Sequence, residues 1–335
     1  MILVTGGTGL VGSHLLYSLI ISNENVRAIH RKSSDLKAVK KVFSFYTNDA
    51  DMLFDKIEWV EADISNVPSL IHAFKDVSYV YHAAAIISFN PKHYSYLKKI
   101  NIEGTANIVN LCLSNGIKKL CYVSTIATLG KSNNGALITE ENEYNPEDKN
   151  SIYAITKYGA EMEVWRGTQE GLDSVIVQPG VIIGSGHWNS ASGSIFKSIS
   201  KGVSFYTTGG IGIVDVRDVI RVMISLMNSP IKNQNYILVA KNIYFKELLS
   251  LIAEFLNKKP PDRYISKWKL ILFSNLDWLS KKLFNTKRKL LKATIDNLYT
   301  ESFYDATKIK EDLNFTFIPF EKTLERVAKH YLMES

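Results

Sequence analysis

The chain has 335 residues, of which 46% are hydrophobic and 22% are charged, and its formal net charge is +7. This composition is typical of a globular protein and excludes a largely disordered chain. The basic residues are spread along the chain, with one concentration between Lys281 and Lys292. A solvated helix face is favoured there over a nucleic-acid surface. No stretch reaches the roughly 18 apolar residues of a membrane span, so we expect a cytoplasmic protein without one.

The two cysteines indicate neither a disulfide nor a metal site. Cys112 and Cys121 lie in apolar surroundings and lack the CxxC spacing of metal and redox motifs. Reduced, buried thiols are therefore expected, and no metal ligands are assigned.

Six short apolar runs alternate with helical patterns in the first half of the chain. Strands are expected at Met1–Thr5, Val26–His30, Ile57–Val60, Tyr79–His82, Leu120–Ser124 and Ser174–Gln178. Helices are expected at Leu10–Ile21, Val67–Phe74, Tyr96–Asn115 and Tyr153–Glu170. Continuous hydrophobicity indicates strands that are buried on both faces. The alternation predicts an α/β fold of the Rossmann type, with a doubly wound parallel sheet.

The regular alternation of strands and helices ends after the sixth expected strand. A Pro179-Gly180 turn opens a stretch rich in glycine and serine. A further strand is expected at Ile213–Val216, which leads into a helix capped by Asp215, with Asp218 in the position of a capping-box acid. Tyr236–Ala240 is the last expected strand.

These changes predict two parts that pack closely together. Residues 1–178 are expected to form the Rossmann domain, with 213–240 returning to it. Residues 179–212 and 241–335 are expected to form a smaller, mostly helical lobe that binds the substrate.

A glycine-rich loop follows the first expected strand and opens the first helix. Glycines allow positive φ angles and a close approach of the backbone to a pyrophosphate, whose charge meets free N–H groups at the helix start. Context and spacing together predict a dinucleotide-binding loop made of Thr5, Gly6, Gly7, Thr8, Gly9, Leu10, Val11 and Gly12.

The end of the second expected strand bears on the choice of cofactor. An acidic side chain there accepts from a free ribose 2′-hydroxyl, whereas a basic one pairs with a 2′-phosphate. This chain offers Arg31 and Lys32, and no carboxylate occurs before Asp35. NADP(H) is therefore preferred over NAD(H), and the bidentate guanidinium makes Arg31 the better candidate. The alternative is that both residues are ordinary exposed loop charges.

Tyr153 and Lys157 are the expected catalytic pair. Residues four apart lie on one face of a helix, so an ammonium can sit beside a phenol and favour its ionisation. The spacing also occurs in Tyr94 to Lys98 and Tyr304 to Lys308, so the motif alone is weak. What distinguishes Tyr153 is the order of elements before it: the glycine loop, five strands, a strand end that carries hydroxyls, a loop, and then its own helix. The other two tyrosines lack this placement.

Ser124 and Thr125 compete to supply the hydroxyl that positions the substrate. Adjacent strand residues point to opposite faces, so only one of them should face Tyr153. The strand pattern is almost equally compatible with either residue, and the family resemblance described below, counted back from Gly130, favours Thr125.

The glycine spacing and the Tyr/Lys pair resemble the extended short-chain dehydrogenase/reductase family, whose TGxxGxxG form is matched at Gly6, Gly9 and Gly12. The resemblance implies a nicotinamide cofactor and further site residues. Asp63 and Ile64 would contact the adenine, and Asn101 would support the active site. Two further segments would contact the rest of the cofactor. The first consists of His82, Ala83, Ala84 and Ala85, and the second of Pro179, Gly180, Val181 and Ile182.

The segment Val26–Arg31 looks like that of the dihydroflavonol reductase-like and hydroxysteroid dehydrogenase-like branches, and not like the nucleotide-sugar epimerases that carry an acid there. We therefore expect an NADP-dependent carbonyl reductase or alcohol dehydrogenase acting on a small molecule. The alternative within the family is a sugar-nucleotide epimerase or dehydratase with tightly bound NAD. A cofactor-sensing scaffold is a third hypothesis, disfavoured because a sensor has no need of a proton donor.

Two expectations concern partners. The segment Trp268–Phe284 combines apolar and basic residues and suits a helix on the core better than a membrane surface. A homodimer is expected by analogy with the family.

Overall fold

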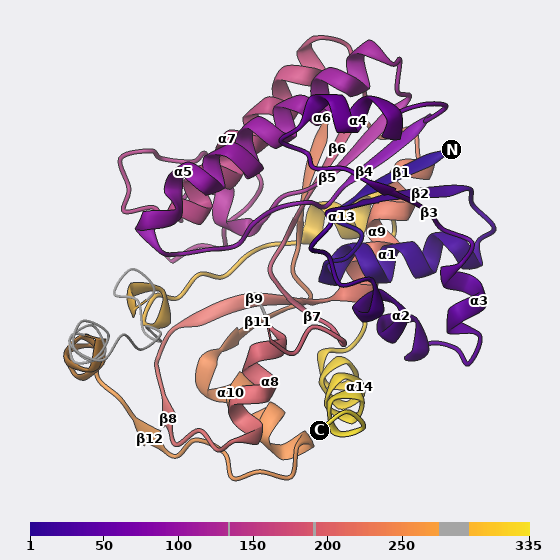
Figure 1. Ribbon diagram of the computed structural model, residues 1–335. Helices are drawn as coiled ribbons and strands as arrows, with labels where there is room; N and C mark the ends of the chain where they lie inside the picture. Colours follow the sequence, from indigo (N-terminus) through magenta and orange to yellow (C-terminus); the bar gives the residue numbers. More distant parts are fainter. Residues whose placement is uncertain (133–134, 190–191, 275–294) are drawn as a thin grey trace.

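A computed structural model describes residues 1–132, 135–189, 192–274 and 295–335 (Figure 1). Its centre is a parallel sheet of seven strands in the order β10-β6-β5-β4-β1-β2-β3. The strands are β1 (Ile2–Thr5), β2 (Val26–His30), β3 (Glu58–Glu61), β4 (Tyr79–His82), β5 (Lys119–Val123), β6 (Ser174–Pro179) and β10 (Gln234–Leu238). The chain winds outward from β1 in both directions, which confirms the Rossmann-type fold.

Helices cover both faces of this sheet (Figure 1). One core cluster joins the sheet to α1 (Leu10–Ile21), α2 (Leu36–Ser44), α3 (Ala50–Phe54) and α9 (Val216–Asn228). The other joins it to α4 (Val67–Ala73), α6 (Gly104–Ser114) and α7 (Ile152–Gln169). Because both faces are covered, the strands can be apolar along their whole length, as the sequence indicates.

The helix expected at Tyr96–Asn115 is interrupted. It consists of α5 (Tyr94–Leu97), a π-helical segment Lys98–Glu103 and α6. Such segments inside α-helices occur frequently at functional sites. This one contains Asn101, so the interruption falls at a residue assigned to the active site.

The remaining elements gather below the carboxyl ends of the main strands (Figure 1). A three-stranded sheet contains β7 (Val181–Ile183), β9 (Gly210–Asp215) and β11 (Lys241–Tyr244), and a smaller one pairs β8 (Phe205–Tyr206) with β12 (Arg263–Tyr264). The helices of this part are α8 (Gly193–Ser200), α10 (Phe245–Phe255) and α14 (Phe320–Leu332), while α13 (Thr307–Asp312) packs against β10. β9 thus joins the small sheet, whereas β10 joins the large one. The proposed division into two functional domains stays a prediction.

The first turn of α9 shows one correct and one wrong expectation. The Asp215 carboxylate accepts a hydrogen bond from Arg217 N at 2.8 Å, so it caps the helix as predicted. Asp218 does not complete a capping box. Its carboxylate accepts from Arg221 and from Ile318 N, each at 2.8 Å, because the segment before α14 brings a competing N–H to it.

Within the described part of the chain, no helix is long and apolar enough to cross a membrane. Residues 267–274 are helical, and Trp268, Leu272 and Phe273 are exposed there. The rest of the Trp268–Phe284 segment, and the basic run from Lys281 to Lys292, lie outside the described residues. Both expectations about them stay predictions.

Candidate active site

The glycine loop has a geometry that only glycine permits. Gly6 has a φ of +71°, and a Cβ there would lie 2.6 Å from Ala84 N. A Cβ on Gly12 would lie 2.1 Å from the Gly6 carbonyl oxygen. The loop is therefore pressed between the first turn of α1 and the end of β4, at the point where the strand order reverses. Such switch points bind ligands in doubly wound sheets.

The first turn of α1 offers donors to a ligand. Gly9 is the N-cap and supplies no side-chain cap. Ser13 N bonds to the Gly9 carbonyl at 2.9 Å, and no described protein group accepts from the N–H groups of Leu10, Val11 and Gly12. Free N–H groups at a helix start favour an anion. Loop and helix together thus fit the pyrophosphate of a dinucleotide.

Basic side chains occupy the end of β2. Arg31 and Lys32 are both exposed. Asp35 is engaged elsewhere, because its carboxylate caps α2 by accepting from Lys37 N and Ala38 N at 3.0 and 3.2 Å. Asp63, after β3, accepts from Ser65 N and Oγ at 2.8 and 2.7 Å. Burial acts to raise the pKa of Asp63, but these hydrogen bonds and the charges of Arg31 and Lys99 lower it.

His82 is enclosed at the end of β4. Its Nδ1 lies 2.6 Å from Thr5 Oγ1, its Nε2 lies 2.9 Å from Thr105 Oγ1, and its side chain is fully buried. Burial, with the charge of Lys157, lowers the pKa of His82 to about 3, so the ring is neutral. The imidazole therefore ties β1 to α6, and the partly exposed Ala83 and Ala84 continue toward the loop.

Asn101 holds the active-site side of α7. Its Nδ2 donates to Thr156 Oγ1 and to the Ile86 carbonyl, each at 3.1 Å. Its Oδ1 accepts from Ile86 N at 2.8 Å. The π-helical segment thus fastens the strand extension after β4 to the helix that carries Tyr153.

Thr125 lies next to Tyr153, and its hydroxyl acts on the pKa of the phenol. Burial raises the pKa of Tyr153 to about 12, and the hydrogen bond with Thr125 acts in the opposite direction. The ring of Phe89 meets that of Tyr153 edge to face, with centroids 5.7 Å apart. The phenol therefore stays protonated at neutral pH in the free protein.

Lys157 is buried and differs from expectation. Its Nζ donates to Tyr122 Oη at 2.5 Å and to the Val123 carbonyl at 2.8 Å. Burial lowers the pKa of Lys157 to about 7, although the charge of Glu161 acts to raise it. The expectation that this ammonium lowers the pKa of Tyr153 is wrong for the free protein, because Lys157 bonds a different phenol.

Ser124 faces away from Tyr153, into a buried network around Glu161. The Glu161 carboxylate accepts from Ser124 Oγ at 2.5 Å, from Thr128 Oγ1 at 2.9 Å and from Gln178 Nε2 at 3.1 Å. The sequence reasoning missed Glu161, Thr128, Gln178 and Tyr122. Glu161 has a signal in the sequence, since it lies four residues after Lys157 on the same helix face.

The segment after β6 reaches the same edge of the sheet. Pro179 ends β6, Gly180 N donates to the Leu238 carbonyl at 3.1 Å, and Val181 and Ile182 enter β7. A Cβ on Gly180 would lie 2.4 Å from the Gly212 carbonyl oxygen, so close packing against β9 requires glycine there. Val181 and Ile182 are partly exposed and border the catalytic edge.

Known proteins share this arrangement. A model of the NAD dependent epimerase/dehydratase family matches residues 2–239. A protein of Synechocystis sp., provisionally named dihydroflavonol 4-reductase, is 26% identical over 321 residues, covering 92% of this chain and 88% of that protein. UDP-glucose 4-epimerase of Vibrio cholerae is 24% identical over 291 residues, covering 82% and 81%.

The solved structure of gox2253 has a similar fold. Its TM-score is 0.81 at 24% identity, and the match covers 100% of this chain and 98% of that one. The family model spans both the glycine loop and the Tyr153/Lys157 helix. This chain therefore belongs to the NAD dependent epimerase/dehydratase family and is an NAD(P)-dependent enzyme of the extended short-chain dehydrogenase/reductase type.

Proposed function

We propose that the protein is an NADP-dependent oxidoreductase that reduces a carbonyl group, or oxidises a secondary alcohol, of a small molecule. The observation that carries this proposal is that Thr125 and Tyr153 are neighbours, at the edge of the sheet that carries the dinucleotide loop. Two neighbouring hydroxyls can hold one substrate oxygen between them. When bound, the nicotinamide would donate or accept the hydride.

Tyr153 would exchange the proton at the substrate oxygen. Because the pKa of Tyr153 is raised to about 12, its neutral form dominates at pH 7 and suits a proton donor in the direction of reduction. Thr125 would orient the oxygen and stabilise charge that develops on it. Asn101, through Thr156, would hold α7 in register with the strand extension after β4.

Lys157 would act on the cofactor side of the pair. Its ammonium already bonds Tyr122 Oη and the Val123 carbonyl, so it is fixed at the end of β5. A hydroxyl of the nicotinamide ribose is a suitable third acceptor for it. The lobe of residues 179–212 and 241–335 would then cover the substrate.

The preference for NADP(H) rests on the end of β2. Arg31 and Lys32 are exposed and free to meet a 2′-phosphate. Asp35, the nearest carboxylate along the chain, is used to cap α2. A carboxylate occupied in this way is less available to a ribose 2′-hydroxyl, which supports NADP(H) over NAD(H).

The test is a binding titration of the purified protein with NADPH and with NADH, after its absorbance has been checked for carried-over cofactor. Tight binding of NADPH to empty protein supports a reductase that releases its cofactor. Carried-over or preferred NAD(H) supports instead an epimerase or dehydratase, the activity named for the Vibrio cholerae relative.

A substitution tests the catalytic assignment. Tyr153→Phe should abolish NADPH oxidation with a panel of aldehydes and ketones and leave NADPH affinity unchanged. Tyr158→Phe is the matched control on the same helix, because its ring stacks on Tyr144. Turnover that survives in Tyr153→Phe would contradict the proton-transfer role.

A further inference from the structure

A second cleft lies on the opposite face of the sheet from α7. It opens between the end of α2, the start of α9 and α14, and its volume is about 540 Å³. This volume falls within the usual range of small-molecule sites. The side chains that matter for its chemistry are Phe45, Arg217, Lys322, Arg326, Lys329 and His330.

The cleft carries more positive than negative charge. Among the described residues, no carboxylate lies within 4 Å of the charged groups of Arg217, Lys322 or Lys329. Arg326 is paired with Asp215 at 2.7 Å, and Glu325 is the one carboxylate in the described lining. The Nε of Arg217 is buried and has no hydrogen-bond partner there. The guanidinium of Arg217 also lies over the Tyr46 ring, with Cζ 4.9 Å from the ring centroid. Its Nε is a buried donor that an acceptor entering the cleft would satisfy.

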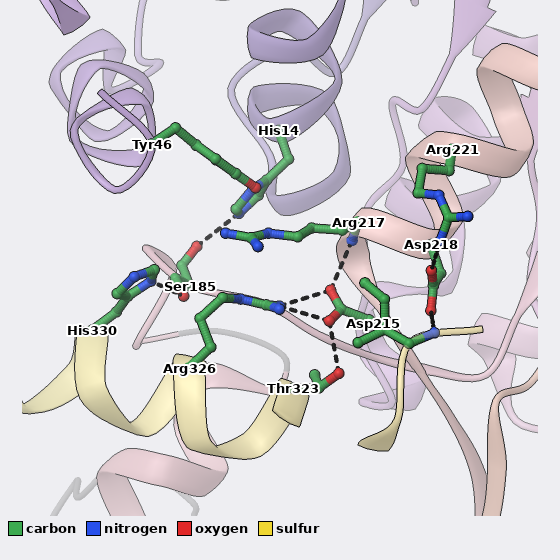
Figure 2. A network of polar contacts seen from close by, with 11 residues as sticks. His14, Tyr46, Ser185, Asp215, Arg217, Asp218, Arg221, Thr323, Arg326 and His330 are labelled. Atoms are coloured by element: carbon green, nitrogen blue, oxygen red, sulfur yellow. Dashed lines mark hydrogen bonds and ion pairs between the residues drawn. The ribbon is translucent and has the colours of Figure 1, made fainter. Parts of the chain in front are cut away.

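The lining is held in place by contacts from other elements. Figure 2 shows Arg326 reaching from α14 to Asp215, with Arg217 beside it. Thr323 donates to the same carboxylate at 2.7 Å. His330 Nδ1 lies 2.8 Å from Ser185 Oγ, and its ring stacks on Phe45 with centroids 4.5 Å apart. Arg326 and His330 are therefore positioned before any ligand arrives.

We propose that this cleft binds a soluble small molecule that carries a phosphate or diphosphate group. Guanidinium groups match phosphate oxygens in a bidentate geometry, and the two lysines add point charges at the rim. A metal cation fits less well, since the cations outnumber the acids. The site is separate from the dinucleotide loop and does not depend on the proposed reaction.

The cleft is connected to the cofactor helix. Ser185, which contacts His330 through its hydroxyl, accepts from His14 Nε2 through its carbonyl at 3.1 Å. His14 lies on α1, two residues after Gly12, and its Nδ1 bonds Tyr46. The hydrogen bonds from His330 through Ser185 to His14 therefore link the lining of the cleft to α1.

The test is a calorimetric titration with inorganic pyrophosphate at fixed ionic strength, on protein saturated with its nicotinamide cofactor so that the loop is occupied. Wild type should bind one equivalent. Lys322→Gln/Lys329→Gln, and separately Arg217→Gln, should weaken binding by about tenfold or more, because each removes a charge-assisted contact. Lys75→Gln/Lys92→Gln, which removes two exposed lysines elsewhere, is the matched control and should change nothing.

Three outcomes would overturn the proposal. The first is that pyrophosphate does not bind the wild-type protein. The second is that the control variant weakens pyrophosphate binding as much as the cleft variants do. The third is that the cleft variants bind pyrophosphate as tightly as wild type. Co-sedimentation with phosphatidic acid vesicles, without any binding of pyrophosphate, would also overturn it, because the ligand would then be a lipid headgroup.

An independent readout comes from His330. Burial, together with the charges of Arg326, Arg217 and Lys329, lowers the pKa of His330 to about 4. An anion among these cations favours the imidazolium, so pyrophosphate should raise the pKa of His330 when it is followed by NMR. The exposed His72 is the internal reference and should not shift. An unchanged His330 at saturating pyrophosphate would count against the site.

Discussion

Ser124 donates a hydrogen bond of 2.5 Å to Glu161, which lies one helical turn after Lys157. Its neighbour Thr125 acts on Tyr153 instead, where it lowers the pKa of the phenol. Adjacent residues at the end of β5 therefore serve two different sites, because successive side chains point to opposite sides of an extended backbone. One hydroxyl belongs to the catalytic edge and the other to the support beneath it.

This arrangement predicts different results for the two alanine variants. Thr125→Ala should lower kcat by about 100-fold or more, since it removes one donor to the reacting oxygen, and should cost at most about 1 kcal/mol of stability, because its Oγ1 also accepts from Ala127 N at 3.3 Å. Ser124→Ala should leave kcat near the wild-type value and destabilise the fold by about 1–3 kcal/mol, because Glu161 loses a buried partner. Steady-state kinetics and urea unfolding on both variants check this. Reversed effects would assign the catalytic hydroxyl to Ser124.

The lowered pKa of Lys157 predicts a change of stability with pH. The folded-state pKa is about 7, below the ordinary value of 10.5, so the unfolded chain binds more protons between these values. Stability should therefore rise with pH from about 7 toward 10, by at most about 1.4 kcal/mol per pH unit from this group. Other groups titrate in the same window, so the quantity to measure is the difference between wild type and Lys157→Met in cofactor-free protein. A difference that is flat across this window would contradict the shift.

Arg31 and Lys32 can be separated by their effects on cofactor choice. Arg31→Ala should raise the KM for NADPH by about 10-fold to 100-fold and leave the KM for NADH nearly unchanged, because a bidentate contact to the 2′-phosphate is lost. Lys32→Ala should have the smaller effect. Lys37→Ala, an exposed lysine on α2, is the control for general charge loss. An equal change in the KM values for NADPH and NADH would show that Arg31 does not bind the 2′-phosphate.

Local pattern was enough to predict the strands of the large sheet and the helix that carries Tyr153 and Lys157. Apolar runs gave the strands of the large sheet, and helical spacing placed Tyr153 and Lys157 on one face of α7. The same spacing extended by four residues would also have found Glu161. Its partner Gln178 lies on β6, a different element, and no pattern along the chain connects the two.

Expectations failed where a distant segment competed for a local group. Asp218 has the spacing of a capping-box acid, yet Ile318 N, a hundred residues later, takes its carboxylate. Lys157 has the spacing to act on Tyr153, yet the buried Tyr122 takes its ammonium. In each case a tertiary contact outweighs a preference that the sequence alone can express.

The pairing of Arg326 with Asp215 predicts a large loss of stability when one partner is removed. Asp215 is fully buried and also caps α9. Arg326→Met should destabilise the fold by about 3–5 kcal/mol, because it leaves a buried carboxylate without its cation. Asp215→Asn/Arg326→Met should recover part of this loss, since the uncompensated charge is gone.

Arg166 is the matched control for this prediction. It forms ion pairs with Glu163 and Glu170 on the surface of α7, at 2.9 and 2.7 Å. Arg166→Met should cost about 1 kcal/mol or less, because exposed pairs contribute little. Urea unfolding of the three variants measures all these values. Equal losses from Arg326→Met and Arg166→Met would mean that the Arg326 pair is no stronger than a surface pair, and that α14 is held on the sheet by its apolar face alone.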